Sequence, residues 1–170
     1  MLKCLKIWKS PSAELAKTTM EKLLDHFLYV MELHANNSFV VYSPALSRQI
    51  PKSFAANAFN VFQRGMYQIE IIRLCALWDE PKNNRLNIPT VVELIDNEKV
   101  IEALAEETRR QWANQPGAPE LKAVNLRFGE EQAAKSRVEL KEAIDAARSV
   151  RSSPSFIAVM NTRHKLAHSL

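Results

Sequence analysis

The sequence contains little glycine and no glycine-rich motif. It has 3 glycines among 170 residues, against a usual fraction of about 7%. Glycine forms the tight turns and phosphate-binding loops of Rossmann and P-loop proteins, and neither motif is present. The same shortage argues against a β-sandwich, which needs many tight turns. The composition therefore favours a small number of long helices.

Cysteine is scarce as well, and long apolar runs are missing. The two cysteines, Cys4 and Cys75, cannot form a disulfide framework and lack the spacing of a zinc site. Cys75 lies in an apolar helical stretch, which indicates a buried structural thiol rather than a reactive one. No segment reaches 18 uncharged apolar residues, and residues 1–9 lack the apolar core of a secretory signal. We expect a soluble, cytoplasmic protein with no membrane contact.

The overall balance of residues is that of an ordinary globular domain. Hydrophobic residues make up 46% of the chain and charged residues 25%, and the net charge is +4. These values disfavour disorder and low-complexity architectures. At this length we expect a single domain over residues 1–170.

Helical periodicity extends over most of the chain. Ser10, Pro11 and Ser12 begin a first helix, which the polar residues 36–38 are predicted to end. A second helix is predicted from Pro51 to about Trp78. The further helices are predicted at Val91–Ile95, from Asp96 or Asn97 to about Trp112, over Leu121–Val150, and from Ser152–Pro154 to the end of the chain. The fold class is therefore an all-α antiparallel helical bundle.

A few positions bear on how these helices would pack. One face of the second helix is apolar and consists of Phe54, Ala58, Val61, Phe62, Gly65, Ile69, Ile72 and Ala76. Gly65 within this face predicts a close approach of another helix. Gly129 is a candidate break in the helix at 121–150, and residues 39–42 carry a weak strand signal. The clearest loop is Gln115–Pro119.

The final helix contains an arginine in an unexpected place. On an ideal helical wheel, Arg163 lies about 20° from Phe156, in the middle of the apolar stripe. A guanidinium stays charged and is costly to bury without a partner. Asp79 and Glu70 lie within or beside the apolar arc of the second helix and are the candidate partners. The arginine then either closes an ion pair that fixes helix register or faces a phosphate.

Two histidines follow the arginine on the same helix. His164 and His168 are four residues apart, and Asn161 precedes His164 by three. No carboxylate or cysteine on this helix completes a metal-ligand set, so we predict no metal and no cofactor. Solvated or capping histidines are one interpretation, and general acid–base catalysis is the other. No acidic residue follows Asp145, which favours an anionic partner.

These residues carry a resemblance to a known family. The run Arg163–His168 resembles the R-(polar)-x3-H signature of the HEPN superfamily of small helical domains. Residues 161–169 and 77–81 are similar to its abortive-infection, or phage-defence, branch. Such domains generally continue beyond the motif, whereas this chain ends at Leu170. A chain truncated at its C-terminus and a natural short form are the two alternatives.

The resemblance implies a metal-independent endoribonuclease that acts as a homodimer, with the two motifs facing each other. Arg163 would then bind the scissile phosphate, and His168 would transfer protons as a ribose 2′-hydroxyl attacks. His164 would assist in positioning, and Asp79 would support Arg163. The remaining supporting candidates are Asn161, Lys165 and Glu70.

The resemblance also leaves other functions open. Some HEPN proteins are non-catalytic and bind RNA, a nucleotide or a partner protein, and a toxin-type role would imply an antitoxin partner. A purely structural helical bundle is the third possibility, if Arg163 only closes an internal ion pair. The sequence identifies neither the RNA target nor the trigger.

Overall fold

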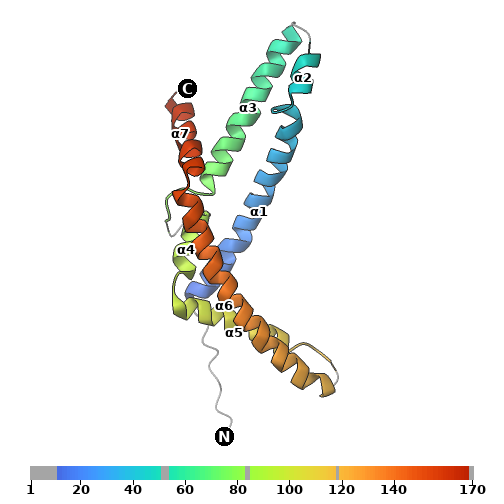
Figure 1. The fold of residues 1–170 in the computed structure, drawn as a ribbon, viewed down its shortest axis with the longest axis vertical. Helices are drawn as coiled ribbons and strands as arrows, with labels where there is room; N and C mark the ends of the chain where they lie inside the picture. The colour runs from blue at the N-terminus through green and yellow to red at the C-terminus, as the bar shows by residue number, and fades with distance from the viewer. Residues whose placement is uncertain (1–10, 51–53, 83–84, 118, 169–170) are drawn as a thin grey trace.

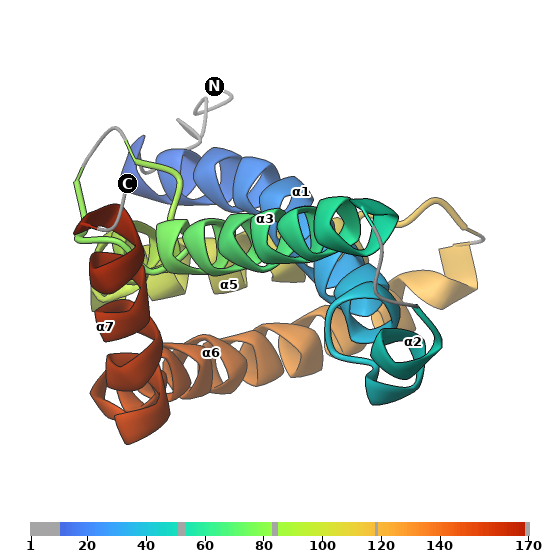
Figure 2. The same ribbon diagram turned by 90° about the horizontal axis from the view of Figure 1, so that it is seen from above.

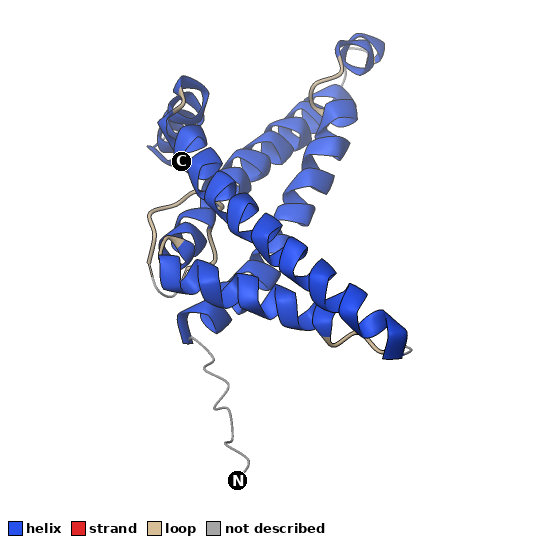
Figure 3. Ribbon diagram, turned by 60° about the horizontal axis from the view of Figure 1, so that its bottom comes forward, coloured by secondary structure: helices blue, strands red, loops and turns tan. Residues whose placement is uncertain are grey.

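The computed structural model describes residues 11–50, 54–82, 85–117 and 119–168, and these residues form helices and loops without a strand (Figure 3). The all-α prediction is therefore confirmed. The elements are α1 (Pro11–Val40), α2 (Pro44–Gln49), α3 (Phe54–Ala76), α4 (Ile88–Ile95), α5 (Glu98–Ala113), the short 3-10 helix η1 (Pro119–Leu121), α6 (Lys122–Ser152) and α7 (Pro154–His168).

The helices form two arms that meet near the start of α1. In one arm α1 and α3 run side by side in opposite directions, with the short α2 at the far tip (Figure 1). In the other arm α5 packs along α6. Helix α7 follows α6 and stands beside the C-terminal end of α3 (Figure 2). None of the described helices is long and apolar enough to cross a membrane.

The apolar core lies where the first half of α1 meets α4, α5 and α6. Its larger members include Leu23, Leu77, Val91, Ile95, Val100, Ile101 and Ile144, all buried. Fully burying a side chain of this size stabilises the fold by about 1.5–3 kcal/mol. Leu77 directly follows α3, so the core anchors the turn that leads out of that helix.

Helix α1 is longer than predicted, because the polar residues 36–38 do not end it. Asn37 is fully buried, and its Nδ2 donates hydrogen bonds to Glu70 Oε2 at 2.6 Å and to the Met66 carbonyl at 3.3 Å. Ser38 Oγ donates to the Ala35 carbonyl. Asparagine breaks a helix mainly by bonding to nearby backbone. Here α3 supplies its partners, so α1 continues to Val40.

The segment between α1 and α3 differs from the prediction. The weak strand signal at residues 39–42 is wrong, because Val40 ends α1 and the next residues form a turn. Helix α2 was not predicted, although Ser43 and Pro44 carry its start signal: Ser43 Oγ accepts a hydrogen bond from the Leu46 amide. The predicted start of the next helix at Pro51 lies outside the described residues.

The later helices agree more closely with the prediction. Asn97 caps α5 through a hydrogen bond from the Lys99 amide, and α5 ends one residue beyond Trp112. Helix α4 begins at Ile88, three residues earlier than expected, because Asn87 Oδ1 accepts a hydrogen bond from the Thr90 amide and caps it. Asparagine side chains are among the best N-caps.

Neither helical glycine has the role predicted for it. Gly129 does not break α6; it is buried where α6 crosses α5, and a Cβ there would lie 2.7 Å from the Arg109 carbonyl oxygen. Gly65 was predicted to allow a close helix approach, but a Cβ there would meet nothing within 4 Å. That prediction is wrong because the apolar face of α3 that contains Gly65 points away from α1.

Alanine substitutions at the two glycines should therefore have opposite effects. Gly129→Ala should lower the free energy of unfolding by about 1–2 kcal/mol, because the clash with backbone outweighs the better helix propensity of alanine. Gly65→Ala should raise it by up to about 1 kcal/mol. Urea denaturation at one fixed protein concentration measures both. A Gly129→Ala protein as stable as the native chain would contradict the close crossing of α5 and α6.

Candidate functional site

Helix α7 is held against the end of α3 by contacts from three consecutive turns. Phe156 packs edge-on against Trp78, with ring centroids 5.6 Å apart. One turn later, the Val159 carbonyl lies 4.0 Å from the Cys75 sulfur, which donates to it. Arg163 follows after one more turn. The three α7 residues lie on one side of the helix at a helical spacing, so the same face that packs on α3 also carries the arginine.

Arg163 pairs with Asp79, as expected from its place on the apolar stripe. Its Nη1 donates a hydrogen bond to Asp79 Oδ1. The side chain of Arg163 is 26% exposed and that of Asp79 is 29% exposed. The pair is therefore neither sealed in the core nor freely solvated. A planar guanidinium held at one edge keeps other N–H donors for a second anion.

Asp79 also binds a second arginine that the sequence did not single out. Arg85 Nη1 lies 3.3 Å from Asp79 Oδ2, so the two oxygens of this carboxylate each face a different guanidinium. Arg85 comes from the loop between α3 and α4. The sequence does show Arg85 six residues after the candidate acid Asp79. Only the folded loop shows that the two side chains meet.

Cys75 lies beneath this ion pair and is 1% exposed. Burial raises the pKa of its thiol, and of the nearby charges Arg163 lowers that pKa while Asp79 raises it. Burial and the raised pKa both disfavour the thiolate that reactivity needs. The expectation of a buried, unreactive thiol agrees with this position.

The remaining predicted residues of α7 lie on its open side. Asn161, His164 and Lys165 are exposed. His168 is the last residue of α7, and its side chain is outside the part of the chain that the structure describes. Arg163 and His164 thus point into different surroundings, the first toward Asp79 and the second toward solvent.

Glu70 is not a partner of Arg163, and its assignment as a supporting residue of that arginine is corrected here. Its side chain is 8% exposed and faces α1. Its Oε2 accepts hydrogen bonds from Asn37 Nδ2 at 2.6 Å and from the Tyr42 hydroxyl at 2.8 Å, and Oε1 lies 2.6 Å from His34 Nδ1. Glu70 and Asp79 are nine residues apart, which places them about 180° apart on an ideal helical wheel. Asp79 lies beyond the end of α3, however, so the wheel does not apply to it.

The Glu70 cluster changes the acidity of two of its members. Burial is the largest influence on Glu70 and raises its pKa, but the hydrogen bonds from Asn37, His34 and Tyr42 together outweigh it, and the pKa is lowered. Burial, followed by the hydrogen bond to Glu70, raises the pKa of Tyr42. Glu70 therefore stays ionised and ties the C-terminal part of α1 to α3.

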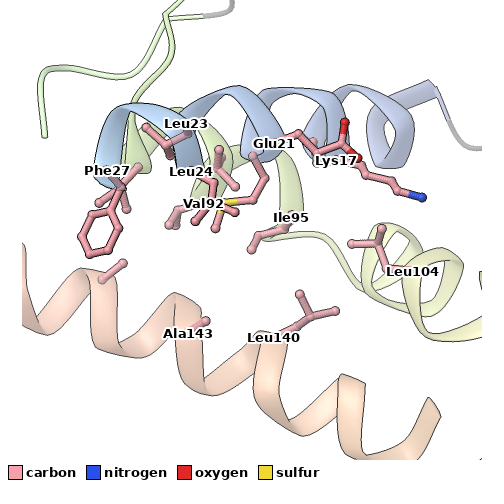
Figure 4. Close-up of a pocket in the computed structure, with 15 residues that line it drawn as sticks. Lys17, Glu21, Leu23, Leu24, Phe27, Val92, Ile95, Leu104, Leu140 and Ala143 are labelled. Carbon is pink, nitrogen blue, oxygen red and sulfur yellow. The ribbon is translucent and has the colours of Figure 1, made fainter. Parts of the chain in front are cut away.

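A wide, mostly apolar groove lies elsewhere in the described structure. It has a volume of about 610 Å³ and lies between α1 and α6, with α4 and α5 forming its base (Figure 4). Leu23, Leu24 and Phe27 point into it from α1, and Leu140 and Ala143 line the opposite side. Lys17 and Glu21 also line it, and none of the predicted site residues does. Among the described residues, no group of three or more His, Cys, Asp or Glu could hold a metal ion.

An abortive-infection domain of the HEPN type is the class to which this all-α chain belongs. A family model described as AbiU2, of this HEPN type, matches residues 17–170. The chain therefore belongs to the AbiU2 family. No curated protein and no solved structure gives a match.

The hydrogen bonds that the buried Glu70 carboxylate accepts should stabilise the fold in a pH-dependent way. At pH 7, Glu70→Gln should lower the free energy of unfolding by about 1–3 kcal/mol, because hydrogen bonds to a buried charged acceptor are lost. The folded-state pKa is depressed. The contribution of Glu70 should therefore be complete above the ordinary glutamate pKa of about 4.3 and vanish as the pH falls through the lower folded-state value.

Denaturant unfolding between pH 7 and pH 2 checks this dependence. Glu139→Gln is the matched control, since Glu139 is an exposed glutamate 3.4 Å from Lys135 on α6, and it should leave stability almost unchanged. A difference between native protein and Glu70→Gln that persisted undiminished at the lowest pH would rule out the ionised carboxylate as its source.

Proposed function

We propose that this chain is a metal-independent endoribonuclease that cleaves RNA in a phage-defence or toxin-type role, with a site assembled across a homodimer. Family membership supports a defence role. The observation that carries the catalytic part is Arg163, which is kept at the surface of α7 by Asp79 and keeps donors free for a phosphate.

Arg163 suits the recognition of a scissile phosphate because it is oriented before the substrate arrives. The Asp79 carboxylate fixes one edge of the guanidinium, and the packing of Phe156 and Val159 fixes the helix that carries it. Preorganised donors stabilise charge that develops in a transition state without a reorganisation cost. Arg163 would neutralise the phosphoryl oxygens while the bond to phosphorus forms.

His168 is the proposed proton-transfer group. As general base it would take the proton of the ribose 2′-hydroxyl, whose oxygen then bonds to phosphorus. The bond from phosphorus to the 5′-oxygen breaks, and the protonated His168 would return a proton to that leaving oxygen. The products are a 2′,3′-cyclic phosphate end and a 5′-hydroxyl end. His164, Lys165 and Asn161 would contact neighbouring parts of the RNA from the exposed side of α7.

The geometry of α7 is the reason for proposing a second copy. Arg163 and His168 are five residues apart, which places them about 140° apart around a helix. Helix α7 is a single α-helix from Pro154 to His168, so a break that would bring the two side chains together is not part of it. A two-fold arrangement would let Arg163 and His168 of different copies meet at one phosphate.

The outward face of α3 is the surface we propose for this dimer. Its apolar residues have no partner on α1: Phe54 is 93% exposed and Val61 is 72% exposed, and Phe62, Ile69 and Ile72 are also exposed. The stripe ends beside α7, next to the turn that carries Asp79. Apolar patches of this kind mark interaction surfaces, and a copy docked here would approach the α7 motif.

A non-catalytic function is the second candidate. The observation that favours it is that Arg163 already has an acidic partner and is only partly exposed, as in an ion pair that fixes helix register. On this alternative the chain would bind RNA, a nucleotide or a partner protein such as an antitoxin without cleaving anything. The nuclease assay below separates the two candidates.

Cleavage of RNA by the native chain in the presence of EDTA is the first expected outcome. Arg163→Ala and His168→Ala should each lower kcat/KM by about 10²–10⁴, since each removes charge stabilisation or proton transfer. Arg163→Lys keeps the positive charge but not the planar guanidinium. Its kcat/KM should therefore lie between that of the alanine variants and that of the native chain. Gel analysis of end groups should show 2′,3′-cyclic phosphates.

The control for the nuclease assay is Arg137→Ala. Arg137 pairs with Glu102 between α6 and α5, far along the chain from the motif, and its loss should leave the rate unchanged. Equal RNA degradation by all variants would indicate a contaminating nuclease and contradict the enzymatic proposal. RNA binding that is lost in Arg163→Ala, without any cleavage by the native chain, would select the non-catalytic module.

The dimer is tested separately through Val61, an exposed valine on the outward face of α3. Val61→Glu should leave the folded chain intact, because surface substitutions usually change stability by about 0.5 kcal/mol or less. It should convert the dimer to a monomer and reduce cleavage, since the composite site is lost. Sedimentation velocity measures the oligomeric state, and circular dichroism measures whether the variant is folded.

The matched control is Val138→Glu, because Val138 is an exposed valine on α6. That variant should remain dimeric and active. A native chain that sediments as a monomer at every concentration, or a Val61→Glu protein that remains a dimer, would rule out this face of α3 as the interface.

A further inference from the structure

Asp79 is shared between two arginines, and this arrangement leaves positive charge at the end of α3. Arg163 faces Oδ1 and Arg85 faces Oδ2, at 3.3 Å for Arg85. Both guanidinium groups therefore contact one carboxylate. Each contacts Asp79 through Nη1, while a guanidinium carries five N–H donors. One negative charge therefore holds two cations that can both still bind an anion.

The charges around this pair do not cancel the excess. Glu80 is the neighbouring carboxylate, and its Oε1 accepts a hydrogen bond from Arg151 Nη2 at 2.8 Å. Lys82 follows in the same loop and is exposed. In the turn itself and the side chains paired to it, Asp79 and Glu80 thus contact Arg163, Arg85 and Arg151, and Lys82 adds a further cation.

At its described residues, the loop between α3 and α4 is held by contacts other than the Arg85 side chain. Its backbone is fixed by the Thr90 hydroxyl, which accepts from the Lys82 amide and donates to the Lys82 carbonyl, both at 3.2 Å. The Ile88 amide donates to the Leu77 carbonyl at 2.8 Å, and Asn87 Nδ2 donates to the Glu80 carbonyl at 3.3 Å. Asn87 and Thr90 are buried, so these bonds are shielded from water.

An exposed ion pair contributes little to stability, and the Arg85 side chain is 41% exposed. The loop would keep its course without this contact. A structural need therefore does not account for the second arginine. Its position on the same carboxylate as Arg163 would let both guanidinium groups bind one anionic ligand.

We propose that Arg85 is a substrate-binding residue, which contacts an RNA phosphate adjacent to the one bound by Arg163. The inference rests on the proposed function, because it concerns the same site and the same ligand. Asp79 would set the spacing between the two arginines. Arg85 would add affinity for the RNA backbone without taking part in proton transfer.

The test is the binding of a 2′-O-methyl oligoribonucleotide to the full chain, measured by fluorescence anisotropy over a range of salt concentrations. This probe lacks the attacking hydroxyl, so binding is separated from cleavage. Arg85→Ala should weaken binding about tenfold. It should also reduce the slope of log affinity against log salt by about 0.7, the value for one phosphate contact on a single strand. In cleavage assays KM should rise more than kcat falls.

Two further variants make the result specific. Arg85→Lys keeps the charge and should preserve the salt slope while recovering part of the affinity. Arg137→Ala removes an arginine of similar exposure whose partner is Glu102, and it should bind as the native chain does. A purely structural role for Arg85 would change thermal stability and leave the salt slope unaltered.

The outcomes for the two proposals differ. If the native chain binds and cleaves RNA while Arg85→Ala matches Arg137→Ala in affinity, slope and KM, the assignment of Arg85 is wrong and the proposed function stands. If the native chain neither binds the oligonucleotide nor cleaves RNA, both proposals are wrong. If Arg85→Ala reduces the slope of log affinity against log salt and Arg85→Lys restores it, the result supports Arg85 as an RNA-binding residue.

Discussion

The carboxylate of Asp79 is the contact on which the arrangement of the candidate site depends. It lies just beyond the end of α3, where the core residue Leu77 and a hydrogen-bonded loop fix the backbone. From this position it holds Arg163 of α7 and Arg85 of the α3–α4 loop. A half-exposed carboxylate is well suited to this task. A more deeply buried pair would incur a larger desolvation penalty, whereas a fully exposed one would orient neither arginine.

Two acids of similar appearance in the sequence have separate roles. Glu70 is buried between α1 and α3, where Asn37, Tyr42 and His34 surround its carboxylate. It binds one helix to another and leaves no capacity for a ligand. Asp79 lies nine residues later, at the surface, and binds cations that can also bind something else. The difference arises from burial, because water can reach the second site and cannot reach most of the first.

The exposed apolar residues of α3 lie on the side that faces away from α1. The side toward α1 carries Glu70 and half-buried residues such as Gln63 and Leu74, while the outward side presents Val61, Phe62, Ile69 and Ile72 to solvent. In a monomer this exposure is unfavourable, because apolar area in contact with water raises the free energy. The proposed dimer would cover this exposed stripe, which lies beside α7.

The amino-acid sequence by itself determined the all-α class, most helix limits, the buried character of Cys75 and the need of Arg163 for an acidic partner. These properties depend on local periodicity, capping residues and the cost of an unpaired charge, all of which can be evaluated within one segment. Only the tertiary structure decided that Asp79 rather than Glu70 is that partner, that Arg85 joins it, and that Asn37 prolongs α1. It also decided that Gly129 rather than Gly65 lies at a helix crossing. These outcomes depend on which faces of distant helices meet, and a single helix does not encode that information.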